Sequence, residues 1–242
     1  EPAVDGTLRA LRAAKNNGIK RVVLTSSTVA IMGGKKQGTI TPEQWTNLQA
    51  KNLSAYTKSK TLAEQAAWDF IKDNEVDKVP ELVSINPGGV FGPAIGENLS
   101  GASMSMASQM LQGKVPMVPN VAFPMVDVRD VAKLHVAALK EEEAANQRFI
   151  ATETNPRSLQ EMGEILNMLG YTGPSTRVAP NIMLKFLSFF DREAAGMVGY
   201  LGMRVSADNS KTKEVFNWEP IPFEQTLKDT AAFIEGLITV KK

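Results

Sequence analysis

The sequence predicts an α/β fold, a doubly wound parallel sheet with a smaller, mostly helical C-terminal lobe. Three short runs at 20–25, 81–86 and 148–152 are apolar and rich in β-branched residues, which is typical of buried parallel strands. Segments with helical periodicity lie between these runs. This alternation of strand and helix predicts helices on both faces of one sheet.

The helices follow from the spacing of apolar residues along the chain. An amphipathic helix is predicted over 3–17, ended by Gly18. A long helix with one apolar face is predicted from Tyr56 to about Asp73, and shorter ones near 102–113 and 129–140. Each helix begins after a predicted strand or loop, as the layered α/β arrangement requires.

Two breaks divide the rest of the chain. The strand at 81–86 stops at Pro87-Gly88-Gly89, after which a loop is predicted from Val90 to about Gly101. Residues 155–242 are predicted to be mostly helical, beginning with a capping box from Ser158 to Glu161. We expect this last part to pack as a smaller lobe over the edge of the sheet where ligands bind.

Composition excludes several classes of function. The formal charge of +1 gives no field that would recruit nucleic acid or an acidic membrane, and the absence of cysteine excludes disulfides and thiolate sites. The longest apolar stretch, 181–190, is interrupted by Lys185 and is too short to span a membrane. The N-terminus does not resemble a secretory signal. We therefore expect a cytoplasmic protein that binds neither nucleic acid nor a membrane, and the charge pattern names no other partner.

Candidate chemistry gathers around one helix start. Tyr56 and Lys60 stand four residues apart, so their side chains share a helix face. A nearby ammonium favours the phenolate form of a tyrosine, which suits acid–base work. Ser26-Ser27 ends one predicted strand upstream, and Asn86 ends another downstream. A hydroxyl, a phenol and a glycine-rich break are therefore predicted to meet at one sheet edge.

Four stretches together closely resemble the extended short-chain dehydrogenases/reductases. They are Thr25-Ser26-Ser27, Tyr56–Glu64, Ile85–Pro93 and Val126–Ala132. The run after Tyr56 is most similar to the branch of dihydroflavonol reductases, cinnamoyl-CoA reductases and yeast-type aldehyde reductases. The resemblance extends from residue 1 to about residue 235. It implies a partial Rossmann-like dinucleotide-binding domain at 1–154 and a substrate lobe at 155–242, with the chain crossing between them.

The resemblance also implies roles for individual residues. Tyr56 would donate a proton to the substrate carbonyl oxygen, and Lys60 would favour that step and bind the nicotinamide ribose. Ser27 would hold the same oxygen, with Ser26 as the alternative by one position. The cofactor would be NADP or NAD, with NADP favoured. The implied cofactor-binding residues are Thr25, Ser26, Tyr56, Lys60, Pro87, Gly88, Gly89 and Val90.

The sequence departs from such relatives in one respect. They begin with a strand, a glycine-rich loop and a helix that bind the pyrophosphate. Neither Gly-x-x-Gly-x-x-Gly nor Gly-x-Gly-x-x-Gly follows a predicted strand here, so we expect that roughly the first third of a relative is not represented. An open sheet edge then predicts self-association or completion of the sheet by another segment.

Three functions remain open at this stage. The first is NAD(P)H-dependent reduction of an aldehyde or ketone with Tyr56 as proton donor. The second is a non-catalytic remnant or subunit that retains the fold. The third is a sugar-nucleotide epimerase or dehydratase, because extended relatives share the Ser, Tyr and Lys set.

Other polar and aromatic residues receive structural interpretations. Asp127-Val-Arg129-Asp130 suits the start of a helix. His135, the single histidine, lies on an apolar stripe and is predicted to be partly buried and structural. A zinc site is implausible with one histidine and no cysteine. The cluster Met183, Phe186, Phe189 and Phe190 more often indicates core than pocket, and no site is assigned to it.

Overall fold

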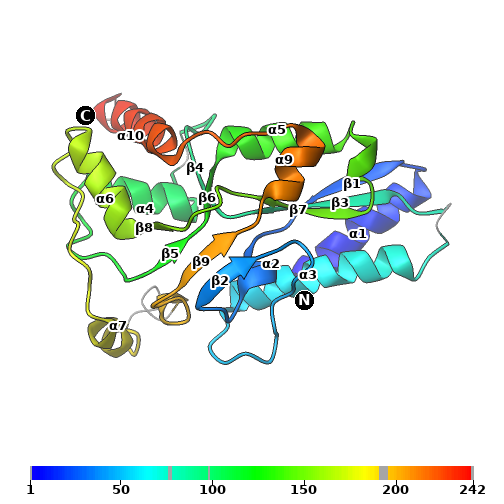
Figure 1. Ribbon diagram of the computed structural model, residues 1–242, viewed down its shortest axis with the longest axis horizontal. Coiled ribbons are helices and arrows are strands. Elements are labelled where there is room, and N and C mark those ends of the chain that lie inside the picture. Colours follow the sequence, from blue (N-terminus) through cyan, green and yellow to red (C-terminus); the bar gives the residue numbers. More distant parts are fainter. Residues whose placement is uncertain (1, 76–77, 98, 191–195, 241–242) are drawn as a thin grey trace.

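A three-stranded parallel sheet lies at the centre of the fold (Figure 1). The computed structural model describes residues 2–75, 78–97, 99–190 and 196–240. Strands β1 (Arg21–Thr25), β3 (Glu81–Pro87) and β7 (Gln147–Ala151) pair in the order β1-β3-β7. All three run in the same direction, with Thr25 opposite Ile85 and Pro87 opposite Ala151. The predicted α/β class with a parallel sheet is confirmed.

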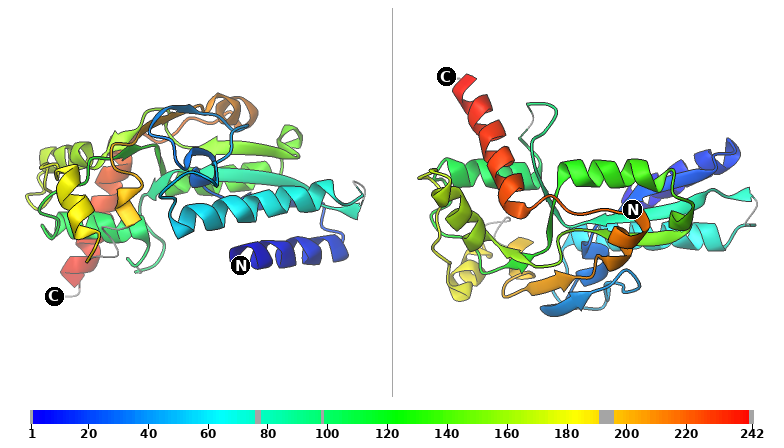
Figure 2. Two further views of the ribbon diagram at one scale, coloured as in Figure 1. Left: turned by 90° about the horizontal axis from the view of Figure 1, so that it is seen from below. Right: turned by 45° about the horizontal axis from the view of Figure 1, so that its top comes forward.

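Helices cover both faces of this sheet. Helices α1 (Pro2–Asn16) and α3 (Ala55–Lys72) run side by side on one face (Figure 2), and α5 (Val128–Ala138) and α9 (Ser210–Phe216) lie on the other. Successive strand residues point to opposite faces, so each strand contributes to both cores. The core on the α3 side contains Leu11, Ala67 and Leu82, and that on the α5 side contains Val83, Ile85, Leu134 and Phe149.

The predicted boundaries of the main helices agree with the structure to within two residues at each end. Helix α4 spans Ala102–Leu111, and helix α6 spans Leu159–Met168, with Ser158 of the predicted capping box as its N-cap. A short 3-10 helix at Glu142–Ala144 precedes β7. Helical periodicity extends over several turns, which is why it locates long helices well.

The loop predicted from Val90 is partly wrong. Strand β4 (Gly89–Phe91) begins there and pairs in parallel with β6 (Met125–Asp127). A three-residue strand carries too little sequence pattern to be recognised, and its partner lies far along the chain. Tertiary pairing, not local composition, makes this segment a strand.

A second sheet joins segments that lie far apart in the sequence. It contains β2 (Gln37–Ile40), β9 (Arg204–Ala207), β5 (Ala122–Phe123) and β8 (Arg157–Ser158), in the order β2-β9-β5-β8. Strand β2 comes from the first part of the chain and β9 from the last, and the two are parallel. Through this pairing, the C-terminal part of the chain contacts strand β2, which follows the short helix α2 (Val29–Met32).

The C-terminal part is built mainly from α6, α7 (Asn181–Leu187) and α10 (Phe223–Val240), which lie with α4 at one end of the molecule (Figure 1). The core shared by α4, α6 and α10 includes Phe91, Met110, Met125, Met162, Leu227 and Ile234. Among the described residues, no helix is long and apolar enough to cross a membrane.

The aromatic cluster in and just after α7 is not part of the core, contrary to expectation. Phe186, Phe189 and Phe190 are 64%, 81% and 78% exposed. Helix α7 lies at a corner of the molecule (Figure 1), so the rest of the described chain covers only part of its surface. The apolar composition of this segment predicts burial, but its position at the corner of the molecule leaves the aromatic side chains exposed.

The N-cap of α6 gives a testable stability prediction. Ser158 Oγ accepts a hydrogen bond from the backbone N of Glu161 at 3.0 Å, whereas the Glu161 carboxylate pairs with Arg157 Nη1 at 2.6 Å. We expect Ser158→Ala to lower the free energy of unfolding by about 1 kcal/mol, because one helix N–H loses its acceptor. Urea denaturation measures this loss. Glu164→Ala, on the exposed face of the same helix, should change stability by less than about 0.5 kcal/mol; equal effects would refute the capping role.

Candidate active site

The serine loop and the glycine-rich break lie side by side at the carboxyl ends of β1 and β3. Ser26 N donates to Ile85 O at 2.8 Å, and Thr28 N donates to Pro87 O at 2.9 Å. The side chain of Asn86 donates from Nδ2 to Ser27 O at 3.2 Å. The parallel pairing of the strands thus continues beyond their ends, and it brings Ser27 next to Pro87.

Helix α3 brings the Tyr and Lys residues to this same edge. Lys60 Nζ donates to Thr25 O at 3.4 Å, which places the ammonium beside the end of β1. Tyr56 lies one turn earlier on the same helix face, and its side chain is 55% exposed. The structure therefore brings Lys60 into direct contact with Thr25, two residues before Ser27, and Tyr56 lies one helical turn away with an exposed side chain.

The two serines have different surroundings. Ser26 Oγ donates to the buried carboxylate of Glu64 at 2.5 Å, so its hydrogen is already used. Ser27 Oγ accepts from Val29 N at 3.3 Å, which leaves its hydroxyl hydrogen available for another acceptor. Of the two positions left open by the sequence, Ser27 is the one that can donate to a substrate oxygen.

A buried carboxylate lies directly beneath this edge. Glu64 is 1% exposed and accepts from Arg148 Nε at 2.7 Å, from Ser84 Oγ at 2.9 Å and from Asn86 Nδ2 at 2.8 Å. Ser84 and Asn86 lie in β3, Arg148 lies in β7, and Ser26 directly follows β1. One carboxylate on α3 therefore joins two strands of the central sheet to the residue that follows the third.

Sequence reasoning gave Glu64 and Arg148 no role. Burial acts to raise the pKa of Glu64, but the hydrogen bond and charge of Arg148, with hydrogen bonds from Ser26 and Asn86, hold that pKa below its usual range. Arg148 also donates to Pro42 O and Gln44 O and stacks on Trp45. The sequence does contain one signal that could have identified Glu64, since it is a glutamate among alanines on the apolar face of a predicted helix.

Packing explains the glycine at position 88. A Cβ there would lie 2.2 Å from Pro124 O, and Gly89 N donates to that same oxygen at 3.0 Å. The backbone from Pro87 to Val90 consequently runs tightly against the segment before β6. The glycine-rich break has a structural cause in addition to the cofactor role that the resemblance implies.

His135 takes the partly buried position that was expected. Its Nδ1 lies 2.8 Å from Val131 O, and its Nε2 lies 2.7 Å from Thr25 Oγ1. Because Nδ1 faces a carbonyl, it carries the hydrogen, and Nε2 accepts from the threonine hydroxyl in the neutral ring. His135 thus orients Thr25 at the end of β1.

Asp127 and Arg129 serve the structure at the start of α5. Asp127 is fully buried and caps the helix, accepting from Arg129 N at 2.8 Å and from Thr226 Oγ1 at 2.9 Å. Arg129 Nη2 bridges Asp127 and Asp229, each at 2.7 Å. The cluster therefore joins α5 to α10, as the structural interpretation of this motif expects.

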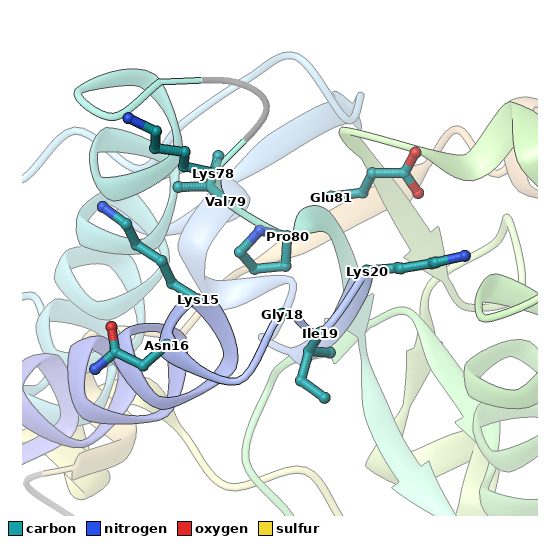
Figure 3. Close-up of a pocket in the computed structure, with 9 residues that line it drawn as sticks. All are labelled: Lys15, Asn16, Gly18, Ile19, Lys20, Lys78, Val79, Pro80 and Glu81. Atoms are coloured by element: carbon teal, nitrogen blue, oxygen red, sulfur yellow. The ribbon is translucent and has the colours of Figure 1, made fainter.

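A surface hollow at the other end of the strands is a separate feature. It is lined by residues before β1 and β3, with Lys15 and Lys78 on one side and Lys20 on the other (Figure 3). These residues lie at the amino ends of parallel strands, whereas ligands of open α/β sheets bind at the carboxyl ends. The hollow is not part of the candidate active site.

Comparison with known proteins gives the family. Residues 1–151 match the NAD dependent epimerase/dehydratase family. The chain belongs to this family. The predicted resemblance to the extended short-chain dehydrogenases/reductases is thereby confirmed.

Individual members of the NAD dependent epimerase/dehydratase family agree with this result. The chain is 28% identical to an NADPH-dependent methylglyoxal reductase of Saccharomyces cerevisiae over 96% of its own length and 69% of the relative. It is 37% identical to a cinnamoyl-CoA reductase of Medicago truncatula, over 62% of the chain and 46% of the relative. The crystal structure of Gre2 from Candida albicans with NADPH superposes with a TM-score of 0.74 at 31% identity, covering 98% of this chain and 70% of that one.

Proposed function

We propose that the protein reduces the carbonyl group of a small aldehyde or ketone with NADPH. The observation that carries the proposal is the meeting of Ser27, Lys60 and the Pro87 backbone at one sheet edge, with Tyr56 one helical turn away. The similarity to NADPH-dependent methylglyoxal reductases and cinnamoyl-CoA reductases supports both the reaction class and the choice of NADPH over NADH.

The residues at this edge fit the nicotinamide and ribose of the cofactor. The hydrogen bond from Lys60 Nζ to Thr25 O is long, at 3.4 Å, and the ammonium has further N–H groups for ribose hydroxyls. The segment from Pro87 to Val90 lies beside the serine loop, because Thr28 N donates to Pro87 O at 2.9 Å. We infer that Thr25, Lys60 and Pro87–Val90 hold this end of NADPH.

The roles assigned to the chain are delivery of a proton to the substrate carbonyl oxygen and hydrogen bonding to that same oxygen. NADPH, when bound, supplies the hydride to the carbonyl carbon. As the C=O electron pair moves to oxygen, Tyr56 gives its phenolic proton to that oxygen, and the product is an alcohol. Ser27 donates a second hydrogen bond to the same atom, so the developing negative charge is stabilised before the proton arrives. The positive charge of Lys60 stabilises the phenolate that remains.

Cofactor binding and turnover test this proposal together. We expect the purified, folded chain to bind NADPH with one-to-one stoichiometry by calorimetry, and to oxidise it when aliphatic or aromatic aldehydes or ketones are added. Loss of NADPH absorbance measures turnover. A folded chain that binds no NADPH would favour the non-catalytic interpretation, and conversion of nucleotide sugars without net NADPH oxidation would favour an epimerase or dehydratase. Either result would overturn the proposal.

A further inference from the structure

A segment from late in the chain contacts the first turn of the helix that carries Tyr56. The Tyr200 hydroxyl lies 2.8 Å from Thr57 Oγ1 and 3.2 Å from Ser54 Oγ. Ser54 is the N-cap of α3, and its Oγ accepts from Thr57 N at 3.0 Å. Tyr56 lies between these two residues in sequence. The Tyr200 hydroxyl therefore joins the hydrogen-bonded group that starts the helix.

The backbone on both sides of Tyr200 is held by a lysine. Lys36 Nζ donates to Gly199 O at 2.9 Å and to Leu201 O at 2.8 Å. Lys36 itself lies just before β2, whose partner β9 begins at Arg204. The same ammonium group binds the carbonyl oxygens of the residues before and after Tyr200. The backbone of Tyr200 is therefore fixed, and so is the direction in which its side chain leaves the backbone.

The same segment also packs closely against the loop before α3. A Cβ on Gly199 would lie 2.5 Å from Asn52 O, so glycine is the residue that fits there. Asn52 has a positive φ of 62°, a backbone conformation that asparagine tolerates better than most residues. Gly199 and Tyr200 thus contact the loop before α3 and the first turn of that helix, which carries Tyr56.

We propose that Tyr200 is a positioning residue for the proton donor, an inference that rests on the proposed function. Its hydroxyl fixes the first turn of α3 through Ser54 and Thr57, and this turn carries Tyr56. Tyr56 is 55% exposed, so its own packing does little to orient it. The C-terminal part of the chain therefore sets the distance between the Tyr56 hydroxyl and the substrate oxygen.

Removing the Tyr200 hydroxyl tests this role. We expect Tyr200→Phe to lower kcat by about ten- to a hundred-fold, because small displacements of a reacting group are costly. The dissociation constant for NADPH should not change, since Lys60 and Ser27 are held by other contacts. The solvent deuterium isotope effect on kcat should rise, because proton transfer from a misplaced Tyr56 becomes more rate-limiting. A purely structural role would not change this isotope effect.

Two further variants complete the test. Tyr171→Phe removes a hydroxyl that bonds Glu235 on the surface, and it should leave kcat and the isotope effect unchanged. Gly199→Ala forces the segment away from Asn52 and should lower kcat at least as much as Tyr200→Phe. If Tyr56→Phe is inactive but Tyr200→Phe keeps wild-type kcat and isotope effect, the positioning role is wrong. If Tyr56→Phe retains full turnover, the proposed function itself fails.

Discussion

Tyr56→Phe is expected to lower kcat/KM for carbonyl reduction by about 10²- to 10⁴-fold, the contribution usual for a general acid. The substitution removes one oxygen atom and keeps the ring. Because the side chain is 55% exposed, the free energy of unfolding should change by less than about 0.5 kcal/mol. Steady-state oxidation of NADPH over a range of aldehyde concentrations measures kcat/KM.

Two controls make the Tyr56 result specific. NADPH binding to Tyr56→Phe should remain within a few-fold of wild type, since Lys60 and the Pro87–Val90 backbone are untouched. Tyr171→Phe, which deletes a tyrosine hydroxyl away from the sheet edge, should retain wild-type turnover. Retained turnover by Tyr56→Phe would remove this residue from the mechanism.

Glu64→Ala is expected to give the largest loss of stability, about 3–5 kcal/mol, because it leaves the Arg148 guanidinium buried without its carboxylate. Ser26, Ser84 and Asn86 lose their acceptor in the same change. Urea denaturation followed by circular dichroism measures the free energy of unfolding. A loss below about 1 kcal/mol, the range of an exposed ion pair, would contradict this account.

The matched control is an ion pair on the surface. Glu219, 78% exposed, pairs with Lys213 at 2.7 Å, and Glu219→Ala should cost no more than about 1 kcal/mol. A double variant distinguishes an unpaired charge from lost packing. If the unpaired charge dominates, Glu64→Ala with Arg148→Ala should cost less than the sum of the two single changes.

The lowered pKa of Glu64 also predicts how stability depends on pH. In the unfolded chain the pKa of a glutamate is about 4.3. The pKa of Glu64 in the folded chain lies below this unfolded-state pKa. The stabilisation that Glu64 provides is therefore fully present above the unfolded-state pKa, and it is lost as the pH falls through the folded-state pKa. We expect the free energy of unfolding of the wild type to fall below about pH 4 more steeply than that of Glu64→Gln, measured by urea midpoints at several pH values. Parallel curves would refute the prediction.

Much of the candidate site could be predicted because it lies where local patterns end. The strand before Ser27 and the helix after Tyr56 each have a periodicity that is visible in the sequence. Carboxyl ends of parallel strands meet at one edge, so residues that follow them must come together. This geometric rule predicts that Ser27 and the break at Pro87 lie near one another, and the start of the helix that carries Tyr56 is predicted at the same edge.

The second sheet and the short strands could not be predicted in this way. Strands β5 and β8 have two residues each, and β4 has three, so no alternation of apolar and polar residues can develop. Their pairing depends on segments that meet only after the chain has folded. The exposed phenylalanines in and just after α7 are predicted to be core residues for a related reason, since an apolar composition carries no information about where the helix lies in the fold.

The α/β class, the long helices, the N-cap at Ser158 and the residue types available for carbonyl chemistry can all be inferred from the amino-acid sequence. The three-dimensional contacts are needed to see that the Ser26 hydroxyl donates to Glu64 while Ser27 Oγ accepts from Val29 N, and that Tyr200 contacts the start of α3. Backbone periodicity is a local property, because each turn or pleat repeats within a few residues. Side-chain partners such as Glu64 with Arg148 and Tyr200 with Thr57 are 84 and 143 residues apart, so folding alone brings them together.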